Sequence, residues 1–462
     1  MSDLPENWVL TRFGEIAKIR NGYAFKSSDF LNQGVPLIRQ SNLSGNKVYL
    51  EKCVYLPIEY LEKYKNFQIK KGDLLIGMSG SIGKLCRFDS DVVALQNQRT
   101  GLIQNEAEEF SCKSYFWHYL KTLEKQLLDK AKGVAVANVS ASDIEALPFP
   151  CPPIEEQRRI ADKLDTTLAR VDTLNDRLAR ITPLLKRFRQ SVLAAATSGR
   201  LTEDWRQNKD ISTFSWKAIT EFREQILPDL PNSWKWVEFS EVASVQSDLR
   251  DPSEYQNEIH LAPNHIEPWS GKISGCQTIA DDAVKSPKHW FNAGQIVYSK
   301  IRPNLCKVAI PNFSGLCSAD MYPISTKLND SYLLLWMLGE RFTIWASNAE
   351  SRTVLPKINT KELGKIPVPV TSAEEQTEIV RRVETLFAFA DRLEARLQSA
   401  QTAAERLTPA LLAKAFRGEL VPQDPSDEPA AELLRRLREA RAADTASKPK
   451  RGRAAKASTV SE

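Results

Sequence analysis

The sequence lacks the features of membrane-bound and exported proteins. No segment of its 462 residues approaches the roughly 18 unbroken apolar residues of a membrane span. Its first residues, Met1-Ser2-Asp3-Leu4-Pro5, have neither the basic nor the apolar region of a signal peptide. Hydrophobic content of 42% and charged content of 26% are typical of a globular protein with two or more domains. We therefore expect a cytoplasmic protein with no membrane partner.

Patterns for metal binding and disulfide formation are also missing. The chain has only four histidines, and its seven cysteines are scattered without a CxxC pair. Such a set argues against zinc and indicates free thiols in a reducing compartment. The cysteines are Cys53, Cys86, Cys112, Cys151, Cys276, Cys306 and Cys317.

Catalytic motifs are absent as well. The glycines of residues 77–85 suggest a phosphate loop, but their spacing is one residue too long, and Leu85 stands where Ser or Thr must ligate magnesium. A turn after a strand is the better interpretation. No GxGxxG, GxSxG, HExxH or Asn/Asp-Pro-Pro-aromatic tetrapeptide occurs. We predict a non-catalytic chain with no cofactor or metal of its own.

Positive charge is not concentrated in any domain. The net charge is +5, so a nucleic-acid partner would be held by chosen residues on particular faces. A basic stretch from Lys448 to Lys456 lacks periodicity and predicts a disordered tail, either solubilising or phosphate-binding.

What the sequence does contain is an internal duplication. Residues 148–201 and 367–420 align without a gap after a shift of 219 positions, with 18 of 54 residues identical. Upstream, the segment from Leu4 to Trp8 recurs as 230–234. Chance likeness between two helices rich in Leu, Ala and Arg would not keep this register. The repeat therefore covers a whole unit of about 220 residues.

Both copies have the pattern of a long amphipathic helix. Their apolar residues alternate three and four apart for more than four heptads, which favours a coiled coil. Small residues of the second seam stand at repeat positions where the first seam has large ones, so we expect the copies to pack on each other, large against small. Pro183 and Pro409 lie inside the seams, where we expect a kink or break. The seams comprise Ile160, Leu164, Thr167, Val171, Leu174, Leu178, Ile181, Leu185, Phe188 and Val192, and Ile379, Val383, Leu386, Ala390, Leu393, Leu397, Ala400, Ala404, Leu407 and Leu411.

Each long helix follows a globular segment with short β-branched runs. One aromatic-rich helix is predicted in each segment, from Tyr115 to Leu128 and from Tyr332 to Trp345. Further helices are predicted to end at Phe222-Arg223-Glu224 and to run from Ala430 to Ala440. The fold class is α+β, with two α+β domains separated by two long helices packed as an antiparallel coiled coil. The predicted parts are a first domain (1–150), a first long helix (151–200), a connecting helix with the second domain (201–366), a second long helix (367–424), and a short helix with the basic tail (425–462).

This plan resembles the specificity subunit of type I restriction–modification systems. The most telling stretches are Ile154-Glu155-Glu156-Gln157, Gly199-Arg200-Leu201-Thr202, and residues 375–384 and 412–420, the last two being similar to the enterobacterial type IA branch. The resemblance implies that each globular domain binds one half of a bipartite site in double-stranded DNA. It also implies that the helices set the spacing and dock two methyltransferase subunits, and that restriction/translocase subunits join the complex. S-adenosylmethionine, ATP and Mg²⁺ are then expected on those partners.

The predicted geometry suits that role. Half-sites bound by a protein twofold lie about one helical turn apart, roughly 34–36 Å. A helix of about 28 residues spans about 42 Å, so the reach is adequate.

Candidate DNA-binding residues lie in polar loops that follow predicted strands. Arg pairs well with guanine, and Asn or Gln with adenine. For each candidate the alternative is a residue of a solvated loop that does not contact DNA. For His265 the alternative is a structural role. The candidates are Arg20, Asn21, Tyr23, Arg39, Gln40, Asn42, Ser79, Ser81, Lys84, Asn97, Gln98, Arg99, Asn264, His265, Lys300, Arg302, Asn304 and Arg352. The candidates for docking or spacing on the helices are Glu156, Gln157, Leu174, Leu178, Glu375, Gln376, Leu393 and Leu397.

Two other functions compete with this hypothesis. A coiled-coil adaptor or scaffold that binds no DNA would explain the helices, but not why the duplicated domains diverge between matching ends. A fused enzyme that both cuts and methylates DNA is opposed by the missing motifs.

Overall fold

The computed structural model describes residues 4–45, 47–105, 111–131, 138–207, 216–348 and 356–447. The chain divides into two compact units. Unit one is Met1–Asp176 with Gln401–Glu462, and unit two is Arg177–Ala400, so each unit holds part of both long helices. Within the described ranges, no helix is long and apolar enough to cross a membrane.

The globular part of unit one, called the first head, is built on two sheets. Their strand orders are β2-β11-β8-β9-β5-β4 and β6-β3-β10-β7. A separate pair, β1 (Val9–Arg12) and β12 (Pro148–Cys151), is antiparallel and leads into the first long helix. The other elements are β2 (Ala17–Asn21), β3 (Val35–Ile38), β4 (Leu43–Ser44), β5 (Lys47–Val48), β6 (Val54–Leu56), α1 (Tyr60–Lys63), β7 (Gln68–Ile69), β8 (Leu74–Gly77), β9 (Leu85–Arg87), β10 (Ala94–Gln96), β11 (Thr100–Asn105), α2 (Lys113–Ala131) and α3 (Ala141–Glu145).

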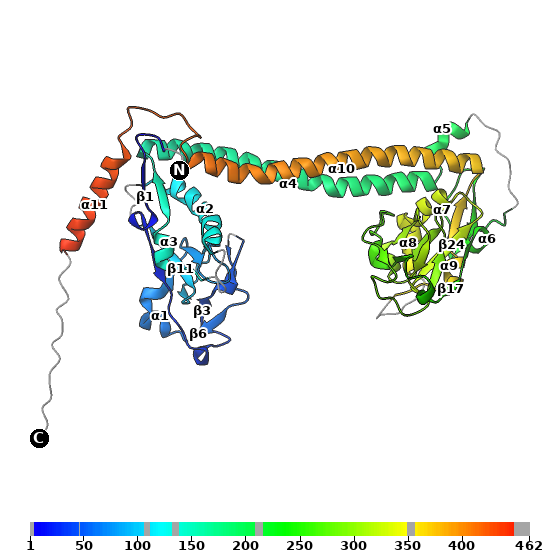
Figure 1. The fold of residues 1–462 in the computed structure, drawn as a ribbon, viewed down its shortest axis with the longest axis horizontal. Coiled ribbons are helices and arrows are strands. Elements are labelled where there is room, and N and C mark those ends of the chain that lie inside the picture. The colour runs from blue at the N-terminus through cyan, green and yellow to red at the C-terminus, as the bar shows by residue number, and fades with distance from the viewer. Residues whose placement is uncertain are drawn as a thin grey trace, which may run out of the picture. The chain divides into compact units, whose positions relative to one another are not determined.

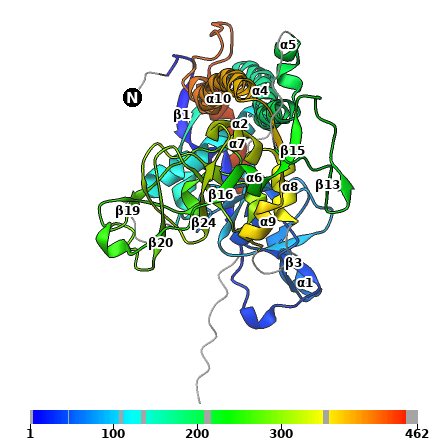
Figure 2. The same cartoon turned by 90° about the vertical axis from the view of Figure 1, so that its right-hand side faces the viewer.

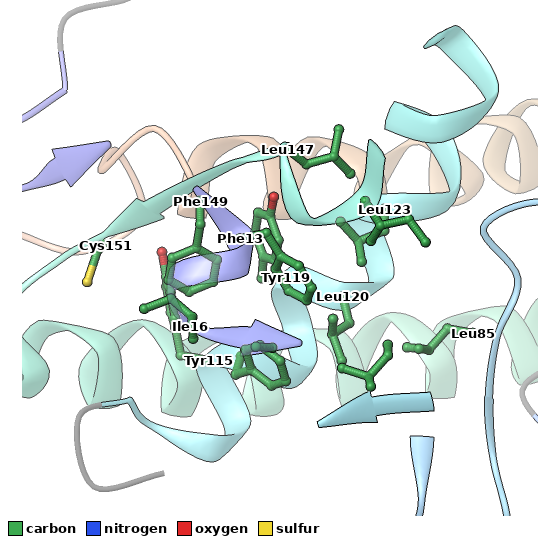
Figure 3. Close-up of a cluster of buried hydrophobic side chains, with 14 of the residues drawn as sticks. Phe13, Ile16, Leu85, Tyr115, Tyr119, Leu120, Leu123, Leu147, Phe149 and Cys151 are labelled. Carbon is green, nitrogen blue, oxygen red and sulfur yellow. The ribbon is translucent and has the colours of Figure 1, made fainter. Parts of the chain in front are cut away.

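The core of the first head lies between α2 and the strands beside it (Figure 3). Tyr115 and Tyr119 are buried on α2, and their hydroxyls donate to the carbonyls of Pro150 and Pro148. Phe149 of β12 packs edge-on against Tyr119, with ring centroids 4.7 Å apart. The Pro-x-Pro strand is therefore tied to α2 by two hydroxyl bonds as well as by ring contacts. The predicted aromatic helix is confirmed as a core element.

The globular part of unit two, called the second head, is also built on two sheets, and several of its elements are labelled in Figure 2. Its sheets have the orders β16-β24-β21-β22 and β17-β20-β23-β18-β19, and β15 pairs antiparallel with β25. The elements are α5 (Glu203–Arg206), β13 (Glu221–Phe222), β14 (Gln225–Ile226), β15 (Lys235–Glu238), α6 (Phe239–Val242), β16 (Ala243–Val245), β17 (Leu249–Arg250), β18 (Ile259–Leu261), β19 (Gln277–Thr278), β20 (Lys288–Phe291), β21 (Ile296–Ser299), β22 (Val308–Ala309), β23 (Gly315–Cys317), β24 (Met321–Thr326), α7 (Asp330–Met337), α8 (Glu340–Ser347), α9 (Thr360–Gly364) and β25 (Pro367–Val370).

The duplication extends to the strand topology of the two heads. The order β2-β11-β8-β9 matches β16-β24-β21-β22, and β6-β3-β10-β7 matches β19-β18-β23-β20. The parallel pair in each head, β10 with β3 and β23 with β18, falls at the same place. Two heads whose sequences have diverged therefore keep one frame.

The long helices are α4 (Ile154–Thr197) and α10 (Ala373–Ala415), and they run antiparallel (Figure 1). In unit one, Ile160 and Leu164 near the start of α4 share a core with Leu412 and Ala415 at the end of α10. In unit two the ends are exchanged, because residues 192–196 of α4 share a core with residues 379–383 of α10. The predicted packing of the two copies on each other is confirmed.

Both seam prolines lie inside unbroken helices, so neither helix breaks at Pro183 or Pro409, and the kink expected as the alternative stays a prediction. A proline removes one backbone donor and crowds the carbonyl four residues earlier. The remaining hydrogen bonds and the packed seam are enough to keep each helix continuous.

Two other helix predictions need correction. Residues 221–226 form the hairpin β13–β14, not the end of a helix, and Arg223 and Glu224 at its turn have φ of 52° and 64°. The helix predicted from Tyr332 to Trp345 is two helices, because Gly339 adopts an extended conformation and caps α8. Glycine favours such an interruption, since it costs helix stability.

Helix α11 (Ala430–Ser447) confirms the short helix predicted near the C-terminus, and it is longer than expected. Its buried Leu433, Leu434 and Leu437 join the core of unit one, and Ala430 N donates to Asn7 O at 3.0 Å. The basic residues of 448–456 lie outside the described residues.

Candidate nucleic-acid interface

Four loops of the first head meet at one edge of its sheets. Tyr23 forms an isolated bridge with Asn97, and Asn97 N donates to Ile38 O at 3.0 Å. Met78 N donates to Arg99 O at 3.2 Å, which joins the loop after β8 to the loop after β10. We call this surface the first edge, and it comprises residues 21–23, 39–42, 79–84 and 97–99.

Most of the candidates on the first edge reach solvent. Asn21, Tyr23, Gln98 and Arg99 are exposed. The Tyr23 ring also packs on Tyr64, with centroids 4.7 Å apart, so the aromatic cluster beneath fixes its position. Half-buried candidates on the same edge are Arg39, Gln40, Ser79, Ser81, Lys84 and Asn97.

Two candidates of the first head are committed to the fold instead. Asn42 is 1% exposed, accepts from Arg39 N at 3.0 Å and donates to Tyr49 O at 3.1 Å. Arg20 donates to Gln68 O at 2.7 Å and to the Gln96 side chain, and its burial lowers the pKa of its guanidinium. These two side chains hold loops in place, and a role for them in contacting DNA stays a prediction.

The second head has a corresponding surface, called the second edge, formed by residues 262–265, 300–307 and 318–320. Lys300 N donates to Asp320 O at 2.9 Å, and Lys307 Nζ donates to Pro263 O. Asn264, Arg302 and Asn304 are exposed, and Lys300 is half-buried. Burial and the charge of Arg302 lower the pKa of Lys307, in that order. Basic and amide groups therefore gather here too.

Of the remaining candidates in the second head, His265 has a structural role. It is 8% exposed, its Nδ1 accepts from Ala262 N at 3.1 Å, and burial lowers its pKa. It occupies the place that Asn42 has in the first head, since each accepts the N-cap amide of a short 3-10 helix. Arg352 lies outside the described residues.

Matching backbone hydrogen bonds show which residues of the two edges are equivalent. Asn97 N donates to Ile38 O in the first head, as Ser318 N does to Leu261 O in the second. Likewise, Gly77 N donates to Lys84 O, and Ser299 N donates to Lys307 O. The equivalent pairs are Asn42 with His265, Asn97 with Ser318, Arg99 with Asp320, and Lys84 with Lys307.

Sequence reasoning missed two residues of the second edge, Lys307 and exposed Asp320. The match of residues 72–76 with 294–298 was visible in the sequence. Extending this alignment, with one residue inserted in the second copy, would have aligned Lys84 with Lys307.

The docking candidates at the helix starts prove to be buried junctions. Glu156 is 1% exposed and accepts from Trp8 Nε1 at 2.9 Å and from Gln423 at 2.7 Å. Burial raises its pKa, and these two bonds oppose that shift. Gln157 is buried as well, where it accepts from Cys112 N at 2.9 Å and donates to Pro152 O.

Unit two repeats this junction. Glu375 is fully buried and accepts from Trp234 Nε1 at 2.9 Å and from Arg206 at 2.5 Å. Gln376 accepts from Asn329 N at 2.9 Å and donates to Thr371 O at 2.8 Å. None of these four side chains belongs to an exposed docking surface. They join each helix to its head and to the segment that follows the other helix.

The four seam leucines proposed for docking or spacing differ in exposure. Leu174 is 40% exposed, Leu397 is 7% exposed, and Leu178 and Leu393 lie between. Leu174 is thus the one most open to a partner.

Among the described residues, no three His, Cys, Asp or Glu side chains are grouped so that they could hold a metal ion. Apart from Asp320, the exposed polar groups of the two edges are hydrogen-bonding and cationic, which suits the base edges and phosphates of a nucleic acid.

The family model described as "Type I restriction modification DNA specificity domain" matches residues 5–182 and 231–400, which is most of the chain. The chain belongs to this family of type I specificity subunits. The specificity subunit of type I restriction enzyme EcoDI from Escherichia coli is 47% identical over 366 residues, covering 77% of this chain and 82% of that protein. The EcoBI specificity subunit, also from Escherichia coli, is 31% identical over 97% of this chain and 95% of its own length.

A solved chain supports the same fold. It comes from a study of complex assembly and conformational transition of the type I R-M system, and covers 90% of this chain and 100% of its own length. Its TM-score is 0.61 at 17% sequence identity. The family model and the EcoDI and EcoBI relatives confirm the resemblance to enterobacterial type I specificity subunits.

Proposed function

We propose that this chain is the non-catalytic specificity subunit of a type I restriction–modification complex and that each head reads one half of a bipartite duplex site. The observation that carries this proposal is the pair of equivalent edges. Their frames share one strand order, whereas their exposed side chains differ. A scaffold without DNA has no need for that divergence, but a reader of two different half-sites does.

The exposed groups on the edges suit the major groove. Arginine pairs with the O6 and N7 of guanine, and asparagine or glutamine with adenine. The first edge offers Gln98 and Arg99, and the second offers Asn264 and Arg302. Lysines at the same edges supply phosphate contacts, which position the protein without reading sequence.

Catalysis belongs to partner subunits in this proposal. Two methyltransferase subunits dock on the helices, and restriction/translocase subunits join them, with S-adenosylmethionine, ATP and Mg²⁺ bound there. The complex works in the cytoplasm, in agreement with the seven free cysteines of this chain. The pure chain alone therefore transfers no methyl group to DNA.

Mapping methylated adenines tests this proposal. The full chain is assembled with its methyltransferase subunits and incubated with genomic DNA that lacks methylation. We expect methylation at a single bipartite sequence, and none when this chain is omitted. Methylation at the same sites without the chain, or methylation by the chain alone, would contradict the proposal.

We further propose that the helices set the length of the spacer between half-sites. One heptad added to both helices, near Arg177 and Arg396, keeps the seam and lengthens each helix by about 10 Å. Because B-DNA rises about 3.4 Å per base pair, the preferred spacer should grow by about three base pairs. A folded variant that methylates only the original spacing would show that the helices dock partners but do not set the distance.

A further inference from the structure

The loops after β8 and β21 contain equivalent residues in the left-handed region. In the first head this residue is Gly80, with φ of 64°, and in the second it is Arg302, with φ of 45°. Ser79 and Ile301, the residues before them, each form an isolated bridge, with Asn138 and Lys357 respectively. A glycine adopts this conformation freely, whereas an arginine adopts it at a cost. The second head therefore keeps a strained arginine where the first has a relaxed glycine.

The loop that carries Arg302 is held firmly on both sides. Arg302 N donates to Pro356 O at 2.8 Å, and Leu305 N donates to Arg302 O at 2.9 Å. At its far end, Cys306 Sγ donates to Met337 O at 3.4 Å. The Arg302 side chain, by contrast, is exposed and makes no ion pair or hydrogen bond within the part of the chain that the structure describes. Backbone strain at a rigid loop with a free side chain is typical of a functional site.

The first head fills the same place from a different loop. The Gln40 amide lies over Gly80, so that a Cβ built on Gly80 would stand 3.1 Å from Gln40 Nε2. Gln40 is the first residue of the 3-10 helix after β3, and its counterpart in the second head is Pro263. The proline side chain has no hydrogen-bonding group for a base. Where one head has glutamine and glycine, the other has proline and arginine.

We propose that one base-reading position is occupied by Gln40 in the first head and by Arg302 in the second. By the hydrogen-bonding capacity of each side chain, Gln40 reads adenine and Arg302 reads guanine at the equivalent base pair of each half-site. This assignment rests on the proposed function. It gives a reason for an arginine in a conformation that glycine would adopt without strain.

The substitution Arg302→Gly separates reading from folding, because glycine fits φ of 45°. The variant is assembled with the methyltransferase subunits, and methylation is scored on a library in which both half-sites are randomised. We expect one guanine of the second half-site to lose its preference by about ten- to a hundredfold. The first half-site should stay unchanged, and the melting temperature of the chain should not fall.

Three further variants sharpen the test. Arg302→Lys should weaken the same guanine preference, since lysine keeps the charge without the bidentate fork. Gln40→Ala should relax one adenine of the first half-site only. Arg341→Ala removes an exposed arginine of α8 that is not among the residues of the second edge, and should leave both half-sites unchanged.

Two results are distinguishable from each other. If Arg302→Gly retains the full guanine preference, or the second half-site contains no guanine, the assignment is wrong while the proposed function stands. If the unmodified complex methylates no defined bipartite sequence, the proposed function itself fails.

Discussion

At the residue scale, each long helix begins on a buried glutamate that receives an indole N–H from its own head. Trp8 and Trp234 are the donors to Glu156 and Glu375. A carboxylate removed from water is stable only when its oxygens are hydrogen-bonded, so these bonds stabilise the junction between head and helix. The sequence showed the Trp and Glu pairs as repeated letters. It did not show that they meet, because their contact spans 148 residues in unit one.

Substituting Trp8 with Phe should therefore destabilise unit one. Phenylalanine keeps the aromatic packing but leaves one oxygen of Glu156 without its donor, so we expect the free energy of unfolding to fall by about 1–3 kcal/mol. Urea unfolding measures the change. Trp117→Phe is the matched control, because Trp117 is half-buried in the same head and its indole makes no such bond in the described structure. Equal effects of the two substitutions would contradict the role of the junction.

A second residue-scale prediction concerns pH. Hydrogen bonds from Arg381 and Arg382 hold the pKa of Glu378 at about 2, below its ordinary 4.5. Because the folded pKa is the lower one, the stabilisation is complete above about pH 4.5 and is lost as the pH falls toward 2. Glu378→Gln should lower the free energy of unfolding at pH 7 by less than about 1 kcal/mol, because solvent screens the ion pairs.

The effect of Glu378→Gln should shrink when urea unfolding is repeated at pH 3. Glu384→Gln, an exposed change on the same helix, serves as the control and should change the free energy of unfolding far less at pH 7. A loss of stability in Glu378→Gln that is the same at pH 7 and pH 3 would rule out the ionised pair as its cause.

At the element scale, sequence patterns identified the regular segments well and the interruptions poorly. The heptad seams were predictable because their period is a local signal. The hairpin at residues 221–226 was not predictable, because its turn residues Arg223 and Glu224 adopt positive φ and neither is a glycine or asparagine, the residues that usually indicate such a turn. On the edges, Asn42 and His265 were candidates for DNA contact. The sequence does not show that each is buried against a 3-10 helix, because that burial depends on the fold.

The continuity of α4 through Pro183 leads to an element-scale prediction. Pro183 is exposed, so its ring adds no core packing, while it removes one backbone hydrogen bond from the helix. Pro183→Ala should raise the free energy of unfolding by about 1–3 kcal/mol in urea titrations. Thr182→Ala, an exposed neighbour, serves as the control and should change it far less. Reduced stability in Pro183→Ala would mean that the proline fits a bend that the helix needs.

At the scale of the whole molecule, the duplication is what relates sequence to function. It was visible in the helices and at the start of each repeat, and it led to the right family and fold class. The common strand order of the heads was not visible, because strand pairing is non-local and the intervening residues have diverged. The backbone hydrogen bonds of the structure alone show which residues of the two edges are equivalent. The proposed shared role of Gln40 and Arg302 depends on that equivalence.

The central claim is that the two heads read their half-sites independently, and exchanging one head tests it most directly. Residues 20–140 are replaced by the matching segment of a relative, and methylated sites are mapped with the assembled methyltransferase complex. The account predicts a new sequence in one half-site, with the other half-site and the spacer unchanged. A folded, active hybrid in which both half-sites change, or in which neither changes, would contradict it.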